Sequence, residues 1–470
     1  MAQFDLIVIG SGPGGYVAAI RGAQLGLQTA LIEKDGGLGG TCLWRGCIPA
    51  KTWLESAHRY EQMASLSEFG IANVDTSKMK ADLSAIVARK GKIVIKNAKG
   101  IDFLMKKNKV TILKGFGKLM GSGRVEVKGE TTEIHSAKKI ILATGSVPRE
   151  LPGLETDGQQ VLNSDHILDL TNLPSHLVIL GGGAIGVEFA STFARLGSKV
   201  SLIELADRLL PIEDEAISVE LSKIFTRSYK IDCKVKTKIT SVEKKKGSIV
   251  CQLSGACNDR LEASHLLIAA GRSPVTSKIG LESTRAKVEK GYVQVNDVML
   301  TAEEGLYAIG DIVNTPWLAH VASDEGIVAA EHAAQSLGKS IEPHPINYTR
   351  VPSCVYCDPE VSSIGLTEKN AKDQGYQVAV GQFPFMPMAK ANILGEAHGF
   401  IKIVSDTKYG EILGIHIIGP KATELIASSV VLMGGEFTVQ TLMHTMYPHP
   451  TLNEVFPEAA RAVHKQSINM

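Results

Sequence analysis

The feature that most restricts the fold of this chain is a pattern of strand, glycine-rich turn and helix that occurs twice. The apolar stretch 4–9 runs into the turn GSGPGG at 10–15, and the apolar stretch 176–180 runs into GGGAIG at 181–186. Both turns fit G-x-G-x-x-G, and an acidic residue closes the next apolar stretch, Glu33 in the first copy and Glu204 in the second. Corresponding positions lie 171 residues apart. The sequence therefore predicts a duplicated α/β unit.

The glycines of such a turn have separate physical tasks. The first permits the tight turn, the second lets the backbone approach a pyrophosphate, and the third lets the helix pack closely on the strand. The helix N-terminus supplies positive partial charge, and the acidic residue accepts a hydrogen bond from a ribose hydroxyl. One such motif alone is often a tight turn without a ligand. Two complete copies with matched acids predict that the chain binds two dinucleotides.

Composition limits the class of protein. The 470 residues suffice for several globular domains, and 50 basic against 49 acidic side chains give a net charge of +1, which favours neither nucleic acid nor a membrane surface as partner. The apolar stretches are of strand length, well short of the roughly 18 residues of a membrane-spanning helix. A strand pattern begins almost at Met1 and leaves no room for a leader. We expect a soluble, cytoplasmic chain.

The first copy carries 45 more residues between its acid and the next strand end, Ala143-Thr144-Gly145, than the second copy carries before Gly271. This insertion contains GGTCLWRGCIPAK at 39–51. Its cysteines, Cys42 and Cys47, are close enough in sequence to form a disulfide. A helix N-terminus and the nearby Lys51 would favour thiol exchange. Two buried thiols, a structural clip and half of a metal site remain alternatives, although no second Cys/His pair lies near.

With these motifs in place, the chain resembles the class I pyridine nucleotide disulfide oxidoreductases. The resemblance covers essentially the whole sequence, and members that oxidise dihydrolipoyl groups are the most similar. It rests on the segment 39–51, on the first glycine segment 5–26 and on four further stretches: ATG at 143–145, GRSP at 271–274, GLYAIGD at 305–311 and YPHPTLNE at 447–454.

This resemblance implies an α/β fold with two Rossmann-like dinucleotide-binding domains, a central domain and an α+β C-terminal dimerisation domain. The implied ranges are 1–149 for the FAD domain with its redox insertion, 150–276 for the NAD domain, 277–345 for the central domain and 346–470 for the interface domain. It further implies FAD and NAD as cofactors, a homodimer, and a lipoyl-bearing protein of a 2-oxoacid dehydrogenase complex or of the glycine cleavage system as partner. No metal, nucleic acid or membrane is implied.

The resemblance also implies roles for single residues. Cys42 would be the exposed interchange thiol and Cys47 the thiol facing the flavin, with Lys51 and Glu188 as an ion pair beside the flavin ring. His449, held by Glu454, would move protons at the disulfide of the partner subunit, since a carboxylate fixes the tautomer and raises the basicity of a histidine. A histidine between two prolines, taken alone, would only be a rigid turn.

The implied cofactor contacts form two sets. Those to FAD are Gly10, Gly12, Gly14, Gly15, Glu33, Lys34, Gly40, Thr41, Lys51, Gly117, Ala143, Thr144, Gly145, Gly310, Asp311, Ala319 and His320. Those to NAD are Gly181, Gly183, Ile185, Gly186, Glu204 and Gly271. Glu204 itself favours NAD, because a carboxylate binds a free 2′-hydroxyl and repels a 2′-phosphate, and only Arg208 is near enough in sequence to offset that repulsion.

Four residues depart from the pattern of similar proteins: Trp44, Arg45, Tyr447 and Pro448. We expect altered contacts around the disulfide and in the dithiol channel. The stretch 351–356 reads as a strand, whose alternation would place Cys354 and Cys357 on opposite faces as structural residues.

The alternative function is an NAD(P)H-dependent reductase of another disulfide, similar to glutathione reductase or mercuric reductase. The C-terminus lacks the cysteine pair of mercuric reductases. A non-catalytic relative of the same fold should have lost Cys42, Cys47 or His449, and this chain keeps all three.

Overall fold

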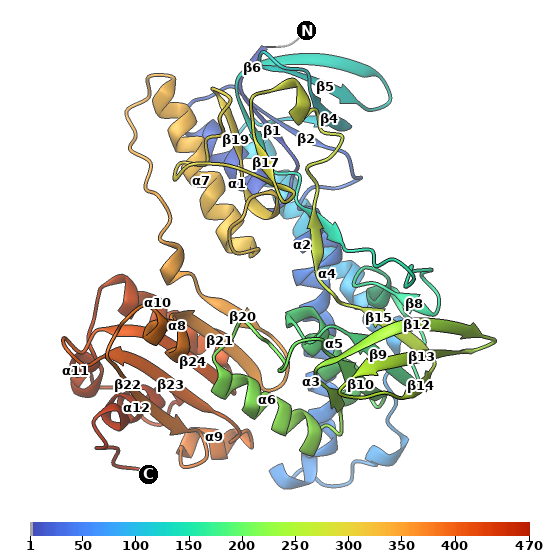
Figure 1. The fold of residues 1–470 in the computed structure, drawn as a ribbon, viewed down its shortest axis with the longest axis vertical. Helices are drawn as coiled ribbons and strands as arrows, with labels where there is room; N and C mark the ends of the chain where they lie inside the picture. The colour runs from blue at the N-terminus through green and yellow to red at the C-terminus, as the bar shows by residue number, and fades with distance from the viewer. Residues whose placement is uncertain (1–2) are drawn as a thin grey trace. The chain divides into compact units, whose positions relative to one another are not determined.

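The computed structural model describes residues 3–470, which form two compact units (Figure 1). The first unit contains the residues up to 52 together with 84–149 and 271–348, and the second contains 53–83, 150–270 and 349–470. The four domain ranges expected from the sequence do not coincide with these two units, because residues 53–83 of the range 1–149 belong to the second unit, and they stay a prediction.

A parallel sheet forms the centre of the first unit. Its middle strand β1 (Gln3–Ile9) pairs with β2 (Thr29–Glu33) on one side and with β6 (Thr132–Leu142) on the other. Outside these lie β3 (Thr111–Lys114) beside β2 and β19 (Leu306–Ala308) beside β6. The chain therefore returns to this sheet after the second dinucleotide unit. The antiparallel strands β4 (Phe116–Leu119) and β5 (Arg124–Lys128) extend the sheet from β6.

The helices of the first unit follow from its turns. Helix α1 (Pro13–Gln24) begins with a proline, which fits the first helical position, and packs against α7 (Ala319–Ser336). The insertion between β2 and β3 supplies this unit with α2 (Gly40–Arg45), the start of α3 (Cys47–Ala64) and nearly all of α4 (Leu83–Lys107). The rest of α3 and the short 3-10 helices η1 (Leu66–Phe69) and η2 (Thr76–Lys78) belong to the second unit.

The second unit contains the second parallel sheet, in the order β11 (Asp232–Lys234), β10 (Lys199–Ile203), β9 (His176–Leu180), β15 (His265–Ile268) and β8 (Val161–Leu162). Its helices are α5 (Ala184–Arg195) and α6 (Glu215–Arg227). An antiparallel sheet of β12 (Thr237–Lys245), β13 (Ser248–Gly255) and β14 (Arg260–Ala263) follows. The order β11-β10-β9-β15 repeats the order β3-β2-β1-β6 of the first unit, so the predicted duplication is confirmed at the level of topology.

The C-terminal part of the second unit is a five-stranded antiparallel sheet covered by helices. The strand order is β20 (Ser353–Val355), β21 (Glu360–Gly365), β24 (Ile412–Gly419), β23 (Phe400–Asp406) and β22 (Val378–Pro384). Every residue of β23 and β24 is buried. The helices are α8 (Glu368–Asp373), α9 (Ala389–Leu394), α10 (Ala422–Gly434), α11 (Val439–His444) and α12 (Val455–Val463). This matches the expected α+β character of the C-terminal domain.

The strand expected over 351–356 is shorter than predicted, because only Ser353–Val355 is extended and paired. Pro352 lacks the N–H that a ladder needs. Cys357 lies beyond the strand, where its buried thiol donates a hydrogen bond to the Pro359 carbonyl at 3.2 Å. Cys354 is half-buried in β20, and neither cysteine forms a disulfide. Burial raises the pKa of the Cys357 thiol, which suits an inert structural residue.

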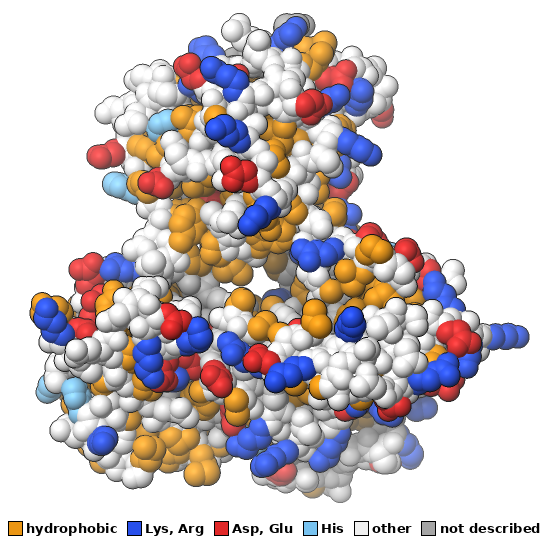
Figure 2. All heavy atoms as spheres, in the orientation of Figure 1, with side chains coloured by type: hydrophobic (Ala, Val, Ile, Leu, Met, Phe, Trp, Pro, Cys, Tyr) orange, Lys and Arg blue, Asp and Glu red, His pale blue; other side chains and the backbone are white. Residues whose placement is uncertain are grey.

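The surface carries charges of both signs. Figure 2 shows basic and acidic side chains interspersed over the drawn face, as the net charge of +1 leads one to expect. None of the helices within residues 3–470 has the length and apolar character that crossing a membrane requires.

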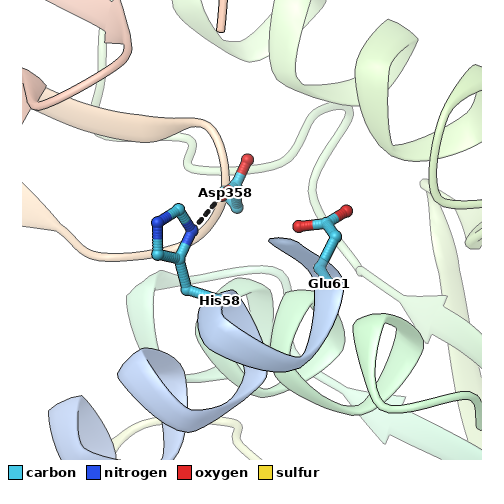
Figure 3. A group of neighbouring side chains, drawn as sticks. All are labelled: His58, Glu61 and Asp358. Atoms are coloured by element: carbon cyan, nitrogen blue, oxygen red, sulfur yellow. Dashed lines mark ion pairs between the residues drawn. The ribbon is translucent and has the colours of Figure 1, made fainter. Parts of the chain in front are cut away.

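A buried arginine organises a polar cluster inside the second unit. His58, Glu61 and Asp358 point toward one another, and their potential ligand atoms lie within 4.8 Å (Figure 3). The guanidinium of Arg195 donates to Glu61 at 2.5 Å and to His58 Nδ1 at 2.9 Å, and it lies 3.0 Å from an Asp358 oxygen. Because this guanidinium already supplies the positive charge, the cluster reads as a structural crosslink between α3, α5 and the turn after β20.

Candidate active site

The first and last glycines of both dinucleotide turns are required by close packing. A Cβ on Gly15 would lie 1.8 Å from the Gly10 carbonyl oxygen, and a Cβ on Gly186 would lie 1.8 Å from the Gly181 oxygen. Gly10 and Gly181 have φ of +102° and +113°, a region that favours glycine. Each helix therefore starts in contact with the strand that precedes it, which brings its positive end to the turn.

The middle glycines leave open space where a ligand would approach. A Cβ on Gly12 or on Gly183 would meet no atom within 4 Å. Gly14 differs, since its Cβ would lie 2.7 Å from the Ala322 carbonyl oxygen, so it serves the packing of α1 on α7. Two bare turns, each at a helix N-terminus, fit the pyrophosphate groups of FAD and NAD.

The acid of the first copy is fixed by the turn itself. The buried Glu33 carboxylate accepts hydrogen bonds from Ser11 N at 3.0 Å, from Ser11 Oγ at 2.5 Å and from Asp35 N at 2.8 Å. These donors hold the carboxylate in one orientation at the end of β2. This is the position from which it can accept from a ribose hydroxyl.

The acid of the second copy has matching contacts. Glu204 accepts from Gly182 N at 2.5 Å and from Ala206 N at 2.6 Å, the equivalents of Ser11 N and Asp35 N. Arg208 donates to the Pro211 carbonyl at 3.0 Å rather than to Glu204. The internal repeat therefore extends to single hydrogen bonds, and the negative charge at this position fits NAD rather than NADP.

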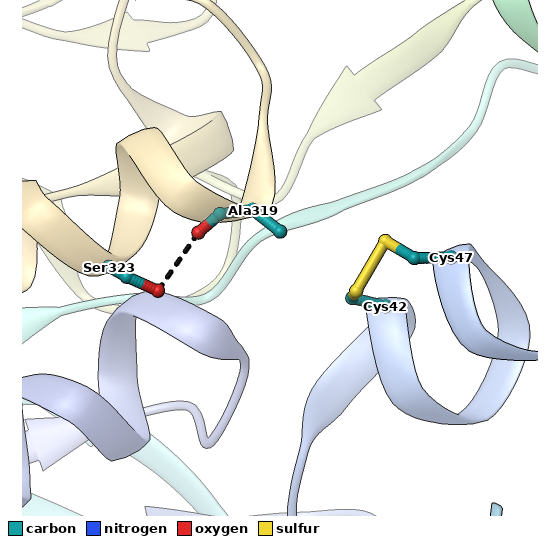
Figure 4. The surroundings of a disulfide bond; sticks show 4 residues. All are labelled: Cys42, Cys47, Ala319 and Ser323. Atoms are coloured by element: carbon teal, nitrogen blue, oxygen red, sulfur yellow. Dashed lines mark hydrogen bonds between the residues drawn. A yellow bond between two sulfur atoms is a disulfide. The ribbon is translucent and has the colours of Figure 1, made fainter. Parts of the chain in front are cut away.

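Cys42 and Cys47 form a disulfide, with a Cα–Cα distance of 4.7 Å (Figure 4). Cys42 lies in α2, Cys47 is the first residue of α3, and Gly46 separates the two helices. Figure 4 draws Ala319, at the start of α7, in the surroundings of the pair. The predicted disulfide is confirmed, and the readings as two packed thiols or as half of a metal site are wrong.

The disulfide segment is anchored directly on the first dinucleotide turn. Gly39 N donates to Ser11 O at 3.0 Å and to Ser11 Oγ at 3.2 Å. Gly40 has a φ of +59°, and its Cβ would lie 2.5 Å from Gly12 Cα. Only glycines allow this approach, so the sequence GG before Thr41 and Cys42 sets the disulfide beside the FAD turn.

The unusual residues between the cysteines contact the segment after β2. Trp44 Nε1 donates to the Leu38 carbonyl at 2.9 Å, and its ring fills the space that a side chain at Gly37 would need. Arg45 forms an ion pair with Asp35. Both departures from the pattern therefore brace the loop between Glu33 and the disulfide.

Other residues assigned to FAD occupy the same unit. Gly310 and Asp311 form the 3-10 turn η5 (Gly310–Ile312) after β19, and His320 is exposed in the first turn of α7. Further residues of this set lie at strand ends, in the disulfide segment or, for Gly117, within β4: Lys34, Thr41, Lys51, Gly117, Ala143, Thr144 and Gly145. Their contacts with FAD stay a prediction.

Two residues that the sequence argument did not assign support Asp311. Ser146 Oγ donates to Asp311 Oδ2 at 2.5 Å. Arg272 in turn donates from Nε to Ser146 Oγ at 2.7 Å and from Nη2 to the Ser146 carbonyl at 2.8 Å. The only sequence signal was that each directly follows a motif glycine, Gly145 or Gly271.

His449 and Glu454 are brought together near the C-terminus. His449 Nδ1 lies 2.9 Å from Glu454 Oε1, and Glu454 Oε2 accepts from Thr451 N at 2.9 Å. Burial opposes ionisation of Glu454, but these hydrogen bonds outweigh it and hold the pKa of the carboxyl below its usual range. The His449 side chain is 72% exposed, so its free Nε2 side is accessible to a partner. The predicted pairing is thus observed, while its action on a partner's disulfide stays a prediction.

Tyr447, one of the two unusual residues before His449, packs against the C-terminal helix. Tyr447 stacks on Phe456 of α12, with ring centroids 6.3 Å apart and planes 12° from parallel. Burial raises the pKa of Tyr447. Tyr447 therefore holds the segment that carries His449 against α12.

Glu188 is buried in the second turn of α5, and its Oε1 accepts a hydrogen bond from Tyr356 N at 2.9 Å. It is therefore not an ordinary exposed helix residue. Lys51 lies in the part of α3 that belongs to the first unit, whereas Glu188 belongs to the second. Their ion pair stays a prediction, as do the NAD contacts of Ile185, half-buried in the first turn of α5, and of Gly271, which follows β15 with a φ of +94°.

Comparison with known proteins gives a consistent result. A family model for pyridine nucleotide-disulphide oxidoreductases matches residues 4–326, and the model of their dimerisation domain matches residues 351–460. The dihydrolipoyl dehydrogenase of Bacillus subtilis is 41% identical over 480 aligned residues, covering 99% of each chain. The mitochondrial dihydrolipoyl dehydrogenase of Pisum sativum is 37% identical over 99% of this chain and 92% of its own.

Solved structures agree over almost the full length. LpdA from Mycobacterium tuberculosis superposes with a TM-score of 0.88 at 27% identity, covering 98% of this chain and 99% of that one. The HOCl-induced flavoprotein disulfide reductase RclA from Escherichia coli gives 0.84 at 26% identity, covering 97% and 99%. The chain belongs to the pyridine nucleotide-disulfide oxidoreductase family.

Proposed function

We propose that this protein is an FAD- and NAD-dependent enzyme that oxidises protein-bound dihydrolipoamide to lipoamide and reduces NAD+ to NADH. The observation that carries the proposal is the Cys42–Cys47 disulfide held on the first dinucleotide turn, with a second such turn in the same chain. Relatives named dihydrolipoyl dehydrogenase that match this chain over its full length support dihydrolipoamide as the substrate.

The thiol chemistry follows from the disulfide. A thiolate of the substrate attacks Cys42 Sγ, the S–S bond breaks, and Cys47 leaves as a thiolate. The second substrate thiol then attacks the substrate sulfur of this mixed disulfide, which closes the lipoamide ring and releases Cys42. His449, oriented by Glu454, accepts the proton of the attacking thiol. Two electrons now reside on the two cysteines, and the substrate is oxidised.

Bound FAD supplies the two-electron carrier between these thiols and NAD. The protein's own contribution is binding and orientation. The bare turns at Gly12 and Gly183 receive the two pyrophosphates, and Glu33 and Glu204 accept from the riboses. Lys51 and Glu188 are assigned an ion pair beside the flavin ring on the strength of the family resemblance.

The match of residues 351–460 to the dimerisation domain supports a homodimer, in which His449 of one subunit serves the disulfide of the other. The natural substrate is then a lipoyl group on a protein of a 2-oxoacid dehydrogenase complex or of the glycine cleavage system. A cytoplasmic location stays a prediction, because the relatives include bacterial proteins and proteins named as mitochondrial.

Replacing Cys42 tests the proposal. Cys42→Ser should abolish oxidation of dihydrolipoamide while FAD stays bound, because only the interchange thiol is lost. Cys354→Ser is the matched control, since Cys354 is half-buried and takes no part in the disulfide, and this variant should keep full activity. Unchanged dithiol turnover in Cys42→Ser would refute the proposal.

The similarity to RclA favours a second candidate, a reductase of another disulfide substrate. Turnover of glutathione disulfide or of another small disulfide with NADPH, faster than turnover of dihydrolipoamide with NAD+, would select that function. The Glu204 carboxylate argues for NAD and therefore for the first candidate.

A further inference from the structure

The turn Gly310–Asp311 is held from both sides by buried side chains. It follows β19 as the short 3-10 helix η5, and Gly310 has a φ of +69°. Ser146 and Arg272 fix the Asp311 carboxylate from one side, as described above. A short turn has few internal hydrogen bonds, so its orientation depends on such outside contacts.

The contact on the other side comes from Glu325 in α7. This residue is fully buried, and its Oε2 accepts from Gly310 N at 2.6 Å. Its Oε1 accepts from the Tyr348 hydroxyl at 2.9 Å. Burial raises the pKa of Glu325, and the hydrogen bond from Gly310 acts against that rise. The two bonds thus tie the turn to α7 and, through Tyr348, to the 3-10 helix η6 (Tyr348–Arg350).

A buried carboxylate is costly when hydrogen-bond donors rather than a cation compensate it. Such groups are concentrated at functional sites. Helix α7 is itself part of the cofactor-binding architecture, because it packs on α1 where Gly14 and Gly326 allow close approach of the backbones. Glu325 therefore connects α7, which packs on the helix of the first glycine turn, to the turn that carries Asp311.

We propose that Glu325 is a positioning residue of the flavin site, which holds the Gly310–Asp311 turn in the orientation that binds FAD. The proposal rests on the proposed function, because it takes Asp311 as an FAD contact. Glu325 does not act in the chemistry. Its carboxylate keeps the Gly310 N–H satisfied and turned into the protein, so that Asp311 stays fixed between this bond and Ser146.

The test measures the rate at which FAD leaves the holoenzyme, with free flavin separated by filtration. Glu325→Ala should release FAD at least about tenfold faster than the unmodified enzyme, because Gly310 N–H loses its acceptor. Glu325→Gln should stay within about threefold, since its amide oxygen can accept from Gly310 and its NH2 can donate to Tyr348. Glu331→Ala is the matched control on the same helix, where it loses the ion pair of Glu331 with Arg21.

A second readout separates positioning from general loss of stability. The visible circular dichroism of the bound flavin should change in Glu325→Ala and stay unchanged in Glu331→Ala. If the Glu325→Ala protein does not accumulate, the Tyr348→Phe variant is measured in its place. This substitution removes one hydrogen-bond donor to the Glu325 carboxylate, so the variant should release FAD about threefold faster than the unmodified enzyme.

The inference would be overturned if the Glu325→Ala and Glu331→Ala enzymes released FAD at the same rate. Where Tyr348→Phe is measured instead, a rate of FAD release equal to that of the unmodified enzyme would overturn it. An unmodified protein that carries no FAD would instead refute the proposed function itself. The two failures are therefore distinguishable.

Discussion

At the residue scale, Glu204 is the residue proposed to select between NAD and NADP. Its carboxylate is held by two backbone N–H groups, those of Gly182 and Ala206, and projects from the end of β10. A fixed negative charge in this place accepts from a free hydroxyl and repels a phosphate. Because one donor belongs to the glycine turn and the other to the loop after β10, loss of the carboxylate also leaves these two N–H groups without their acceptor.

We expect Glu204→Ala to raise the KM for NAD about tenfold, the effect of losing one hydrogen bond of roughly 1.4 kcal/mol. The preference for NAD over NADP should fall with it. Steady-state kinetics with both dinucleotides measure the change. Asp207→Asn is the control, since Asp207 is exposed in the same loop. An unaltered preference in Glu204→Ala would contradict the role given to Glu204.

His449 is the proposed proton acceptor at the dithiol. His449→Gln should lower turnover of dihydrolipoamide by about 10²-fold or more, the usual contribution of a general base. Reduction of an artificial acceptor by NADH should persist, because it bypasses the dithiol step. His444→Gln is the control: His444 is exposed nearby and bonds only the Gln440 carbonyl, at 2.8 Å. Similar losses in both variants would indicate a structural effect.

At the element scale, the second glycine turn separates ligand binding from folding. Gly183→Ala places a Cβ in open space, so the protein should keep its thermal stability while the KM for NAD rises. Gly186→Ala places a Cβ 1.8 Å from the Gly181 carbonyl oxygen, so α5 must move and the midpoint of thermal unfolding should fall. Thermal unfolding and NAD kinetics on both variants check this contrast. Loss of stability in Gly183→Ala alone would contradict it.

The sequence predicted the elements whose determining residues lie close together along the chain. A strand, a turn of fixed glycines, a helix and an acid lie within about 30 residues, so their pattern is visible and its repetition doubles the signal. The disulfide was predictable for the same reason, since Cys42 and Cys47 lie on either side of Gly46. The strand at 351–356 was overestimated because alternation alone does not show where a ladder partner ends.

The contacts that the sequence could not predict join distant segments. Ser146 and Arg272 lie 126 residues apart, and nothing in either motif shows that they meet at Asp311. The bond between Glu325 and Gly310 depends on the docking of α7 against the end of β19. Such pairs follow from tertiary packing rather than from any periodic pattern.

At the scale of the whole molecule, a buried charge cluster joins the dinucleotide and C-terminal parts of the second unit. Lys402 of β23 donates to Asp214, the N-cap of α6, at 2.8 Å and to Glu368 of α8 at 2.8 Å. Burial opposes ionisation of Asp214, but the hydrogen bonds from Lys402 and from Glu368 N together with the nearby charges of Lys402 and His416 outweigh it and lower the pKa of the carboxyl. Lys402 and Asp214 are almost fully buried.

Because the pKa of Asp214 is lowered in the folded protein, the contribution of this residue to stability decreases as the pH falls. Asp214 stabilises the fold fully above its unfolded pKa of about 3.9, and this contribution is lost as the pH falls through the lower folded value. Asp214→Ala should lower the free energy of unfolding by about 3 kcal/mol at neutral pH, because Lys402 then loses a buried partner. Unfolding by denaturant at pH 7 and at acid pH measures both effects, and the variant should lose less stability on acidification.

Asp373→Ala is the control for this prediction, since Asp373 pairs with Lys369 on the exposed face of α8 at 2.6 Å. A surface pair of this kind contributes little to stability. Equal destabilisation by the two substitutions would contradict the role of the buried cluster.

The central claim is that electrons pass from a dihydrolipoyl dithiol through the Cys42–Cys47 disulfide to FAD and NAD+. Its most direct test is anaerobic addition of dihydrolipoamide to the holoenzyme while the flavin absorbance is recorded, followed by addition of NAD+. We predict that the dithiol reduces the enzyme and that NAD+ reoxidises it with formation of NADH. A flavin that dihydrolipoamide leaves oxidised, in an enzyme that NADH or NADPH reduces, would contradict the account.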